Sequence, residues 1–451
     1  MVGKYISKKT NKMMKYFVFV LFILLSGCMN SSKQSFVIEG KFDFPNESIP
    51  ISTVNLDLIS LENIDTIKTD EDGNFKLSFD VDEPAITYLR LPNGTPLGIF
   101  MESRKKVQIY QRDGKIKFGE SNQLHQLSRK ISYEYYYLKK EFSSEVQITY
   151  YYDSLLNSQL DRLEVLQETG SDNLVDYIKY TAIGYNYSKR IRNLLKIDSV
   201  PITSDGYKFL DDVTFSDKNV LLSKEYINMQ IRSLPSILKR QGKEISSESS
   251  YMYISQQIND ARYRKYAQSM FLLFNYSSLS KTSRASMLNR FKNNYADQIP
   301  SPIAGMFKLM PGNTLFDFEL ENDSSRTVRL SDYKDKMILI DFWATWCAPC
   351  IKEEPFIFEL ARKYPSEIVV LSLNIDEAKE KWLEHIAKLE SLPNIMHFNI
   401  KGGQGSTFAQ QFFLSGVPRY ILLGSKNKII DAFAPKPSSE AVIKHIQENL
   451  K

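Results

Sequence analysis

The stretch DFWATWCAPCIKEEP, residues 341–355, holds two of the three cysteines in this chain of 451 residues, Cys347 and Cys350. An apolar run at residues 337–344 leads into the pair and predicts a buried strand, and the apolar spacing after the pair predicts a helix. Cys347 should therefore lie at a strand-to-helix turn, where exposed N–H groups and the helix dipole favour a thiolate. Cys350, one turn inside the helix, should be the more buried cysteine.

A CxxC pair can bind a metal, form a structural disulfide or carry out redox chemistry. A structural zinc usually needs four Cys or His ligands, but the chain has no second CxxC and no histidine pair at ligand spacing, so we expect no metal. A structural disulfide over so short a loop would constrain little of the unfolded chain. Redox chemistry is the better interpretation. Cys347 would attack a substrate disulfide, Cys350 would resolve the mixed disulfide, and Pro349 would pre-set the first helical turn.

Two carboxylates compete for the role of proton acceptor. Asp341 lies on the apolar strand, on the same face as Leu339 and Trp343, and a buried acid there would have a raised pKa and could take the proton of Cys350. Glu353 follows Cys350 by three residues and is adjacent to it on the helix surface. Glu353 can equally be a solvated helix residue. Both carboxylates stay open as candidates, and the two roles do not exclude each other.

Other features of the C-terminal third resemble the thioredoxin fold. They are Pro355, the sequence GVPR at residues 416–419 and the run LSDYKDKMILIDFW before the motif. Residues 303–451 are most similar to the membrane-tethered thiol–disulfide oxidoreductases of the TlpA/ResA type. The resemblance implies a thiol–disulfide oxidoreductase without a cofactor. Thioredoxins carry an Asp at the position of Asp341, and ResA-like proteins a Glu at that of Glu353.

The resemblance also assigns substrate-positioning residues. Pro418 matches the family's cis-proline, which lies beside the disulfide and leaves a neighbouring backbone edge for an extended substrate segment. Trp346 matches the aromatic residue that flanks the nucleophile, although simple core packing would also explain it. Val417 and Pro349 complete this set. A peroxidase of the peroxiredoxin type would instead need a threonine before its cysteine and a distant arginine.

The sequence predicts several domains. We expect a small antiparallel β-sandwich at residues 35–120, a mainly α-helical region at 121–298, a proline-rich linker or domain entry at 299–313 and a C-terminal α/β thioredoxin fold at 303–451. The β segment also resembles a domain of unknown function that precedes such domains in envelope lipoproteins. In the C-terminal domain, strands are expected near residues 337–343, 368–373, 419–423 and 429–433, and helices near 348–363, 376–390, 406–413 and 438–450.

The N-terminus predicts export and lipidation. Residues 1–27 hold five lysines and no acidic residue, and they end in a ten-residue apolar run at 16–25 that suits a signal peptide. The sequence LSGC resembles the bacterial lipobox, which implies lipidation of Cys28 and a tether at residues 28–34. A plain signal peptide or an uncleaved anchor stays open. Without residues 1–27 the basic and acidic residues balance, so no nucleic-acid partner is expected.

The expected setting is therefore a bacterial cell envelope, with the protein lipid-anchored and facing the periplasm. Its partners would be disulfide-containing envelope proteins and a membrane thiol that donates electrons. We expect a reductase, while an oxidase or isomerase of the same fold stays open. A non-catalytic scaffold lipoprotein is the alternative from another class. Tyrosines cluster in the helical region, where we expect them to pack between helices rather than bind carbohydrate or peptide.

Overall fold

The computed structural model describes residues 35–55, 60–92, 96–197, 200–216, 218–321, 326–376, 378–414 and 416–450. The predicted signal peptide, Cys28 and the tether lie outside these residues. Among the described helices, none is long and apolar enough to cross a membrane. The chain divides into two compact units, one drawn from residues 1–54, 61–200 and 219–227 and the other from residues 55–60, 201–218 and 228–451.

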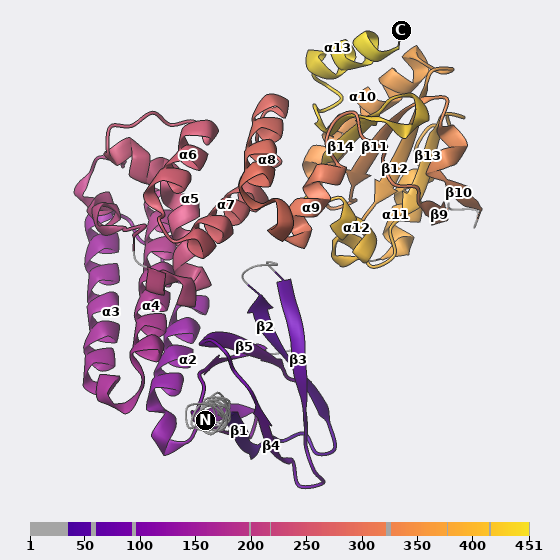
Figure 1. The fold of residues 1–451 in the computed structure, drawn as a ribbon. Coiled ribbons are helices and arrows are strands. Elements are labelled where there is room, and N and C mark those ends of the chain that lie inside the picture. The colour runs from indigo at the N-terminus through magenta and orange to yellow at the C-terminus, as the bar shows by residue number, and fades with distance from the viewer. Residues whose placement is uncertain are drawn as a thin grey trace, which may run out of the picture. The chain divides into compact units, whose positions relative to one another are not determined.

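The N-terminal domain consists of two four-stranded sheets with the orders β4-β1-β7-β8 and β3-β2-β5-β6 (Figure 1). Side chains from both sheets, among them Phe36, Ile51 and Ile109, form one apolar cluster. The strands are β1 Phe36–Lys41, β2 Ser48–Asn55, β3 Ser60–Lys68, β4 Asn74–Phe79, β5 Ala85–Arg90, β6 Pro96–Met101, β7 Lys106–Arg112 and β8 Lys115–Phe118.

One strand pair of this domain departs from the predicted antiparallel arrangement. β1 pairs antiparallel with β4 but parallel with β7. The partners β1 and β7 are far apart in the chain, so no hairpin turn fixes their direction. Alternation within a strand shows which face is buried and does not reveal a distant partner, so the prediction of a purely antiparallel domain is wrong at this pair.

The middle of the chain is helical, as predicted. Its helices are α2 Gln123–Tyr136, α3 Glu145–Leu166, α4 Asp172–Leu194, α5 Lys224–Arg240, α6 Ser247–Gln257, α7 Ala261–Asn275, α8 Lys281–Tyr295 and α9 Ser301–Lys308. The tyrosine cluster divides between interior and surface. Tyr135 and Tyr152 are buried, and Tyr135 donates a hydrogen bond to Gln159, whereas Tyr136 and Tyr150 are exposed.

The segment predicted as a linker or domain entry at residues 299–313 is partly helical. Helix α9 occupies its first half, with Pro300 at the N-cap and Pro302 in the first turn. Proline suits the first turn of a helix because the N–H that it lacks would have no partner there. The prolines therefore mark a helix start at residues 301–308, within the segment predicted as a linker or domain entry.

The C-terminal domain is built on a mixed five-stranded sheet with the order β13-β12-β11-β14-β15. β12 pairs parallel with β11 and β13, whereas β14 pairs antiparallel with β11 and β15. The strands are β11 Met337–Trp343, β12 Ile368–Asn374, β13 Ile395–Asn399, β14 Arg419–Leu423 and β15 Ile429–Ala434; a separate pair consists of β9 Glu319–Glu321 and β10 Thr327–Arg329.

Helices cover both faces of the five-stranded sheet (Figure 1). Leu339 packs in a cluster with apolar residues of α10 (Ala348–Lys363) and α13 (Glu440–Asn449). The next residue, Ile340, belongs to a second cluster with residues of α11 (Lys379–Ile386) and α12 (Thr407–Gln411). Asp341 shares the face of Leu339 because side chains alternate along a strand. The sheet therefore directs Asp341 toward the layer that contains α10.

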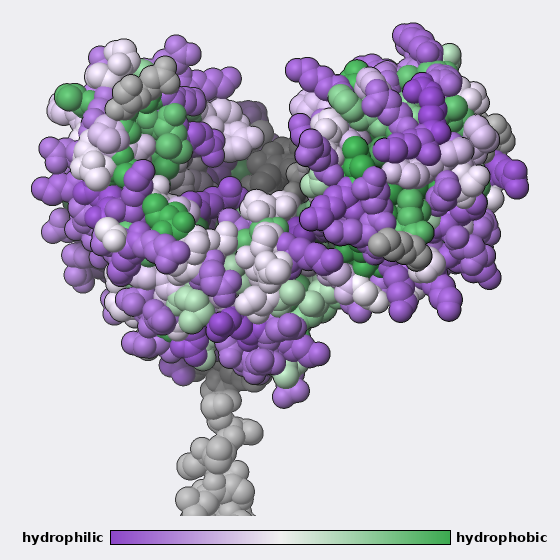
Figure 2. All heavy atoms as spheres, turned by 90° about the horizontal axis from the view of Figure 1, so that it is seen from above, coloured by the Kyte–Doolittle hydropathy of each residue, from purple (hydrophilic) through white to green (hydrophobic). Residues whose placement is uncertain are grey.

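The predicted bounds of β11, β14 and α10 agree with the structure. The helices predicted at residues 376–390 and 406–413 are shorter, and strand β13 was not predicted. β13 is an edge strand of sequence IMHFN, which lacks the long apolar run that marks β11 and β12. The molecular face in Figure 2 is mainly hydrophilic with small separate apolar areas, as expected when the apolar side chains form internal clusters.

Short 3-10 helices connect several elements. They are η1 Glu120–Asn122, η2 Gln167–Thr169, η3 Asp205–Asp212, η4 Lys218–Leu222, η5 Ala296–Gln298, η6 Leu330–Tyr333, η7 Gly403–Gly405 and η8 Ser425–Asn427.

Candidate active site

The two cysteines lie at the start of α10 and are joined in a disulfide. Cys347 occupies the N-cap position, and its Sγ accepts a hydrogen bond from the backbone N–H of Cys350 at 3.2 Å. Pro349 lies in the first turn, as predicted. When the pair is reduced, the N–H groups and dipole at this helix end would stabilise a thiolate on Cys347.

The two cysteines are almost equally buried. The relative exposure of Cys347 is 4% and that of Cys350 is 5%, so the prediction that Cys350 would be the more buried residue is wrong in this oxidised state. The bond between the two sulfurs holds Cys347 against the first helical turn, where its Sγ already accepts the N–H of Cys350. Both cysteines belong to one apolar cluster.

The residues predicted to position the substrate lie at the same end of the sheet. The peptide bond between Val417 and Pro418 is cis, as predicted. Arg419, the next residue, pairs with Phe342 near the end of β11, from which the chain continues to the cysteines. Val417 is partly buried against the cluster that contains both cysteines. Trp346 is 65% exposed, so its ring faces solvent beside Cys347 and is not packed in the core.

Asp341 is a buried carboxyl group in the middle of the sheet. Its exposure is 5%, and its Oδ1 has no hydrogen-bond partner among the described residues. Burial raises the pKa of Asp341 to about 8, and the charge of Glu354 adds to this increase. A carboxyl group with this pKa exchanges a proton readily near neutral pH, which suits a proton acceptor for a thiol.

Glu353 is buried as well, and its carboxylate is held by contacts outside the pair of cysteines. Its carboxylate accepts hydrogen bonds from the backbone N–H and the hydroxyl of Ser438, each at 2.9 Å. Lys436 lies 3.6 Å from the same carboxylate. These contacts join α10 to the segment before α13. The predicted proton-handling role of Glu353 stays a prediction, and the contacts give the residue a structural task.

The comparisons with known proteins concern this C-terminal domain. The profile of a family described as thioredoxin-like matches residues 335–429. Thiol-disulfide oxidoreductase ResA of Geobacillus thermodenitrificans (strain NG80-2) is 26% identical over 140 residues, 30% of this chain and 76% of that protein. A crystal structure of a Bacteroides vulgatus protein assigned as a thiol-disulfide oxidoreductase is 33% identical and covers 32% of this chain and 98% of that chain, with a TM-score of 0.29.

A third relative decides the family. The chloroplastic M-type thioredoxin of Brassica napus is 30% identical over 154 residues, which are 34% of this chain and 74% of that protein. The chain belongs to the thioredoxin-like family. Its C-terminal domain is a thioredoxin-like thiol–disulfide oxidoreductase domain, as the sequence predicted.

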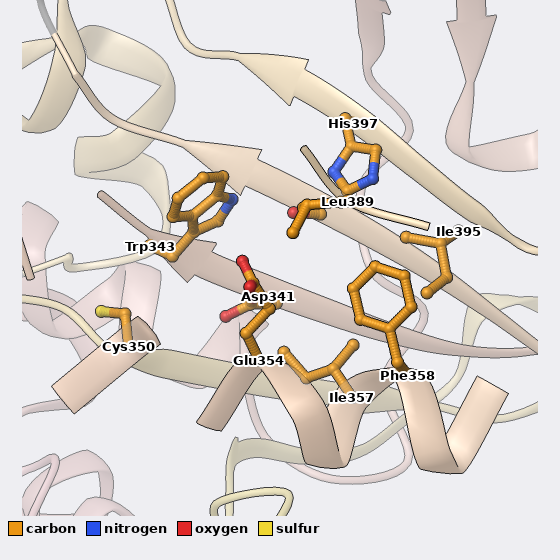
Figure 3. Close-up of a pocket in the computed structure, with 10 residues that line it drawn as sticks. Asp341, Trp343, Cys350, Glu354, Ile357, Phe358, Leu389, Ile395 and His397 are labelled. Carbon is orange, nitrogen blue, oxygen red and sulfur yellow. The ribbon is translucent and has the colours of Figure 1, made fainter. Parts of the chain in front are cut away.

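The sequence did not reveal a small cavity in the thioredoxin-like domain. Ten residues line it, and Figure 3 shows Cys350, Asp341 and Glu354 around the same space. Oε2 of Glu354 and Nε2 of His385 on α11 share a hydrogen bond at 2.7 Å. The spacing of four residues between Cys350 and Glu354 places both on one face of the helix, so the sequence alone indicates that they are neighbours. Nothing in the sequence indicated His385 as the partner.

Asp376 is another buried carboxylate, and the sequence did not reveal its role. Its Oδ2 accepts hydrogen bonds from the backbone N–H of Thr345 at 3.0 Å and from the side chain of Asn374 at 2.9 Å. Thr345 lies two residues before Cys347, so these bonds fix the loop that leads to Cys347 in the thioredoxin-like domain. Among the described residues, no group of three or more His, Cys, Asp and Glu side chains is placed to hold a metal ion.

Proposed function

We propose that this protein reduces disulfides of other proteins in the bacterial cell envelope. The observation that carries the proposal is the position of Cys350 beside the buried Asp341, with Cys347 at the N-cap of α10. This arrangement supplies a stabilised thiolate, a second thiol within bonding distance and a base for the second thiol.

The cycle begins with attack of the Cys347 thiolate on one sulfur of the substrate disulfide. The substrate S–S bond breaks, a mixed disulfide with Cys347 forms, and the other substrate sulfur leaves as a thiolate that takes a proton from water. Asp341 then accepts the proton of the Cys350 thiol. The Cys350 thiolate attacks Sγ of Cys347 and releases the second substrate sulfur, which is also protonated. Two electrons pass to the substrate, and the Cys347–Cys350 disulfide remains.

Substrate binding would involve the surface around the cysteines. The backbone edge at Val417 and Pro418 would pair with an extended substrate segment, and the exposed ring of Trp346 would contact it. Such a site recognises the backbone of a flexible segment more than one particular sequence. The proposed substrates are therefore disulfide-containing envelope proteins, and a membrane thiol would return electrons to the Cys347–Cys350 disulfide.

We also propose that the mature protein is attached to the membrane by lipid on Cys28 and faces the periplasm. The supporting observation is the sequence LSGC after a short apolar run. Each buried CH₂ group of an acyl chain contributes about 0.8 kcal/mol, so more than one chain gives stable attachment. Metabolic labelling with an alkyne fatty acid should label the native chain, and the C28A variant should stay unlabelled.

The two N-terminal sheets, which share a core, are interpreted as a β-sandwich.

The experiment for the reductase proposal is to trap its substrates. The C350A variant cannot resolve the mixed disulfide, so covalent adducts through Cys347 should accumulate in the envelope. The control is the double variant C347A/C350A, which should trap nothing. Absence of adducts in C350A, together with wild-type protein that neither reduces a model disulfide nor oxidises a dithiol, would favour the non-catalytic scaffold. A redox titration of the wild-type pair distinguishes a reductase from an oxidase or isomerase.

A further inference from the structure

Glu354 is a second acidic residue on the face of α10 that lies toward Asp341. Cys350, Glu354, Ile357 and Phe358 follow one another at spacings of four, three and one residues, and all four line the cavity that contains Asp341. Figure 3 shows Glu354 projecting into this cavity between Cys350 and Ile357. Glu353, the neighbouring residue, is bound to Ser438 instead.

The cavity is at the lower size limit for one water molecule. Its volume is about 10 Å³, and a single water needs about 10–15 Å³. Its lining contains the polar side chains of Asp341, Glu354, Ser372 and His397. Any of these can be a hydrogen-bonding partner of a buried water, which needs two to four partners. A water here would connect the two carboxyl groups.

Asp341 needs such a connection because it has little access to solvent. Several titratable groups of the described residues face Asp341 from the elements packed against it. They are Cys350 and Glu354 on α10, His397 on β13 and Tyr420 on β14. Strand β12 contributes Ser372. A proton that reaches Asp341 from Cys350 must leave before the next cycle. Of these groups, Glu354 and His397 both combine a position in the cavity with partial exposure, and the side chain of Glu354 is 22% exposed. The hydrogen bond of Glu354 to a further partly exposed group, His385, distinguishes it from His397.

Glu354 is hydrogen-bonded to a second partly exposed group, His385. The two side chains are 2.7 Å apart, and the side chain of His385 is 24% exposed. The imidazole ring also lies against Trp343, with 5.0 Å between ring centroids. This contact holds the ring beside the cavity. A carboxylate can take up and release a proton at its oxygens. An imidazole can do the same at either ring nitrogen, so protons can pass in both directions.

We propose that Glu354 and His385 form the route by which the proton taken from Cys350 leaves Asp341 for solvent. This inference rests on the proposed function. The proton passes from Sγ of Cys350 to Asp341, through the cavity water to Glu354, and through His385 to bulk water. No electrons move in these steps, because both electrons stay with the sulfur atoms. In the opposite redox direction the same route delivers a proton to Cys350. Glu354 and His385 are positioning and proton-relay residues, since neither touches the substrate.

The test uses the full-length reduced protein and a small disulfide as substrate. Formation of the Cys347–Cys350 disulfide is followed by stopped flow in dilute buffer and again with added imidazole. E354Q and H385Q should each slow this step about tenfold in dilute buffer, less than the effect of losing a general base itself. Imidazole should restore the rate to within about twofold, because a small buffer replaces a missing proton relay. The solvent deuterium isotope effect should be larger in both variants than in the wild type.

The matched control is E359Q, an exposed glutamate on the same helix, which should leave the rate unchanged. The inference is overturned if E354Q has the wild-type rate, if its slow rate is the same with and without imidazole, or if E353Q alone shows imidazole rescue. Thermal unfolding of each variant shows whether packing has been lost. A wild-type protein that exchanges no disulfides would contradict the proposed function itself, whereas active wild type with an unaffected E354Q contradicts only the relay.

Discussion

Replacement of Asp341 by asparagine should stabilise the C-terminal domain, and the gain should depend on pH. Burial raises the pKa of Asp341 from 3.8 to about 8. Each pH unit between the two values corresponds to about 1.4 kcal/mol. At pH 7, about three units above the ordinary value, the folded wild type is therefore less stable by about 4 kcal/mol than it would be with an unperturbed carboxyl group.

The sign follows from proton binding. Above pH 3.8 the unfolded chain releases the proton of Asp341, whereas the folded chain retains it up to about pH 8. The free energy of unfolding of the wild type is therefore highest below the unfolded pKa of 3.8. It falls as the pH rises, and the loss is complete above the folded pKa of about 8. The neutral amide of D341N does not titrate. The difference between D341N and wild type should be small near pH 4, grow steadily and level off above pH 8.

Native-state hydrogen exchange of the β11 amides measures this difference in the intact protein. Variant and wild type are compared at each pH, both in the oxidised form, so that the intrinsic exchange rates cancel. We expect greater protection in D341N at pH 7, equivalent to about 2–4 kcal/mol after the cost of burying the amide. An equal difference at pH 5 and pH 8 would refute the reasoning, since a pKa shift cannot produce a constant effect across that range.

The other predictions concern the site and its loop. The proposed role of Asp341 as proton acceptor requires its ionised form, so the rate of forming the Cys347–Cys350 disulfide should rise with pH through about 8, which a pH series in stopped flow measures. D341N should slow that step about a hundredfold, and a normal rate would contradict the role of base. D376A leaves the Thr345 N–H and the Asn374 amide without their acceptor, so it should cost about 2–4 kcal/mol, measured by thermal unfolding against wild type. W346A should change stability by less than about 0.5 kcal/mol because the ring is exposed, yet raise KM for a protein disulfide and leave reaction with a small disulfide unchanged.

The sequence predicted those parts of the site that follow from local pattern. The run into Cys347 has the length and apolar character of a buried strand, and the spacing after it is that of a helix, so β11 and α10 agree in their bounds with the prediction. The burial of Asp341 also followed, since a polar residue within an apolar strand faces the interior of a covered sheet. The cis bond before Pro418 came from the family resemblance, which a single sequence pattern would not supply.

The rest depended on contacts between distant segments. Glu353 and Glu354 are both neighbours of Cys350 on a helix, and only the packing of Ile357 and Phe358 decides which one faces the sheet. His385 is 31 residues from Glu354 in the chain, and no periodicity links them. The parallel pairing of β1 with β7 is equally non-local. The residues of the active-site loop are local, whereas the groups that surround it are assembled by tertiary structure.

The central claim is that Cys347 is the nucleophile and Cys350 the resolving thiol. The most direct measurement is to react reduced C350A and reduced C347A with a disulfide-linked peptide, quench by alkylation and locate the adducts by peptide mass spectrometry. The account predicts a stable one-to-one mixed disulfide on Cys347 in C350A, and little or no adduct in C347A. Rapid adduct formation on Cys350 in C347A, with none on Cys347 in C350A, would contradict it.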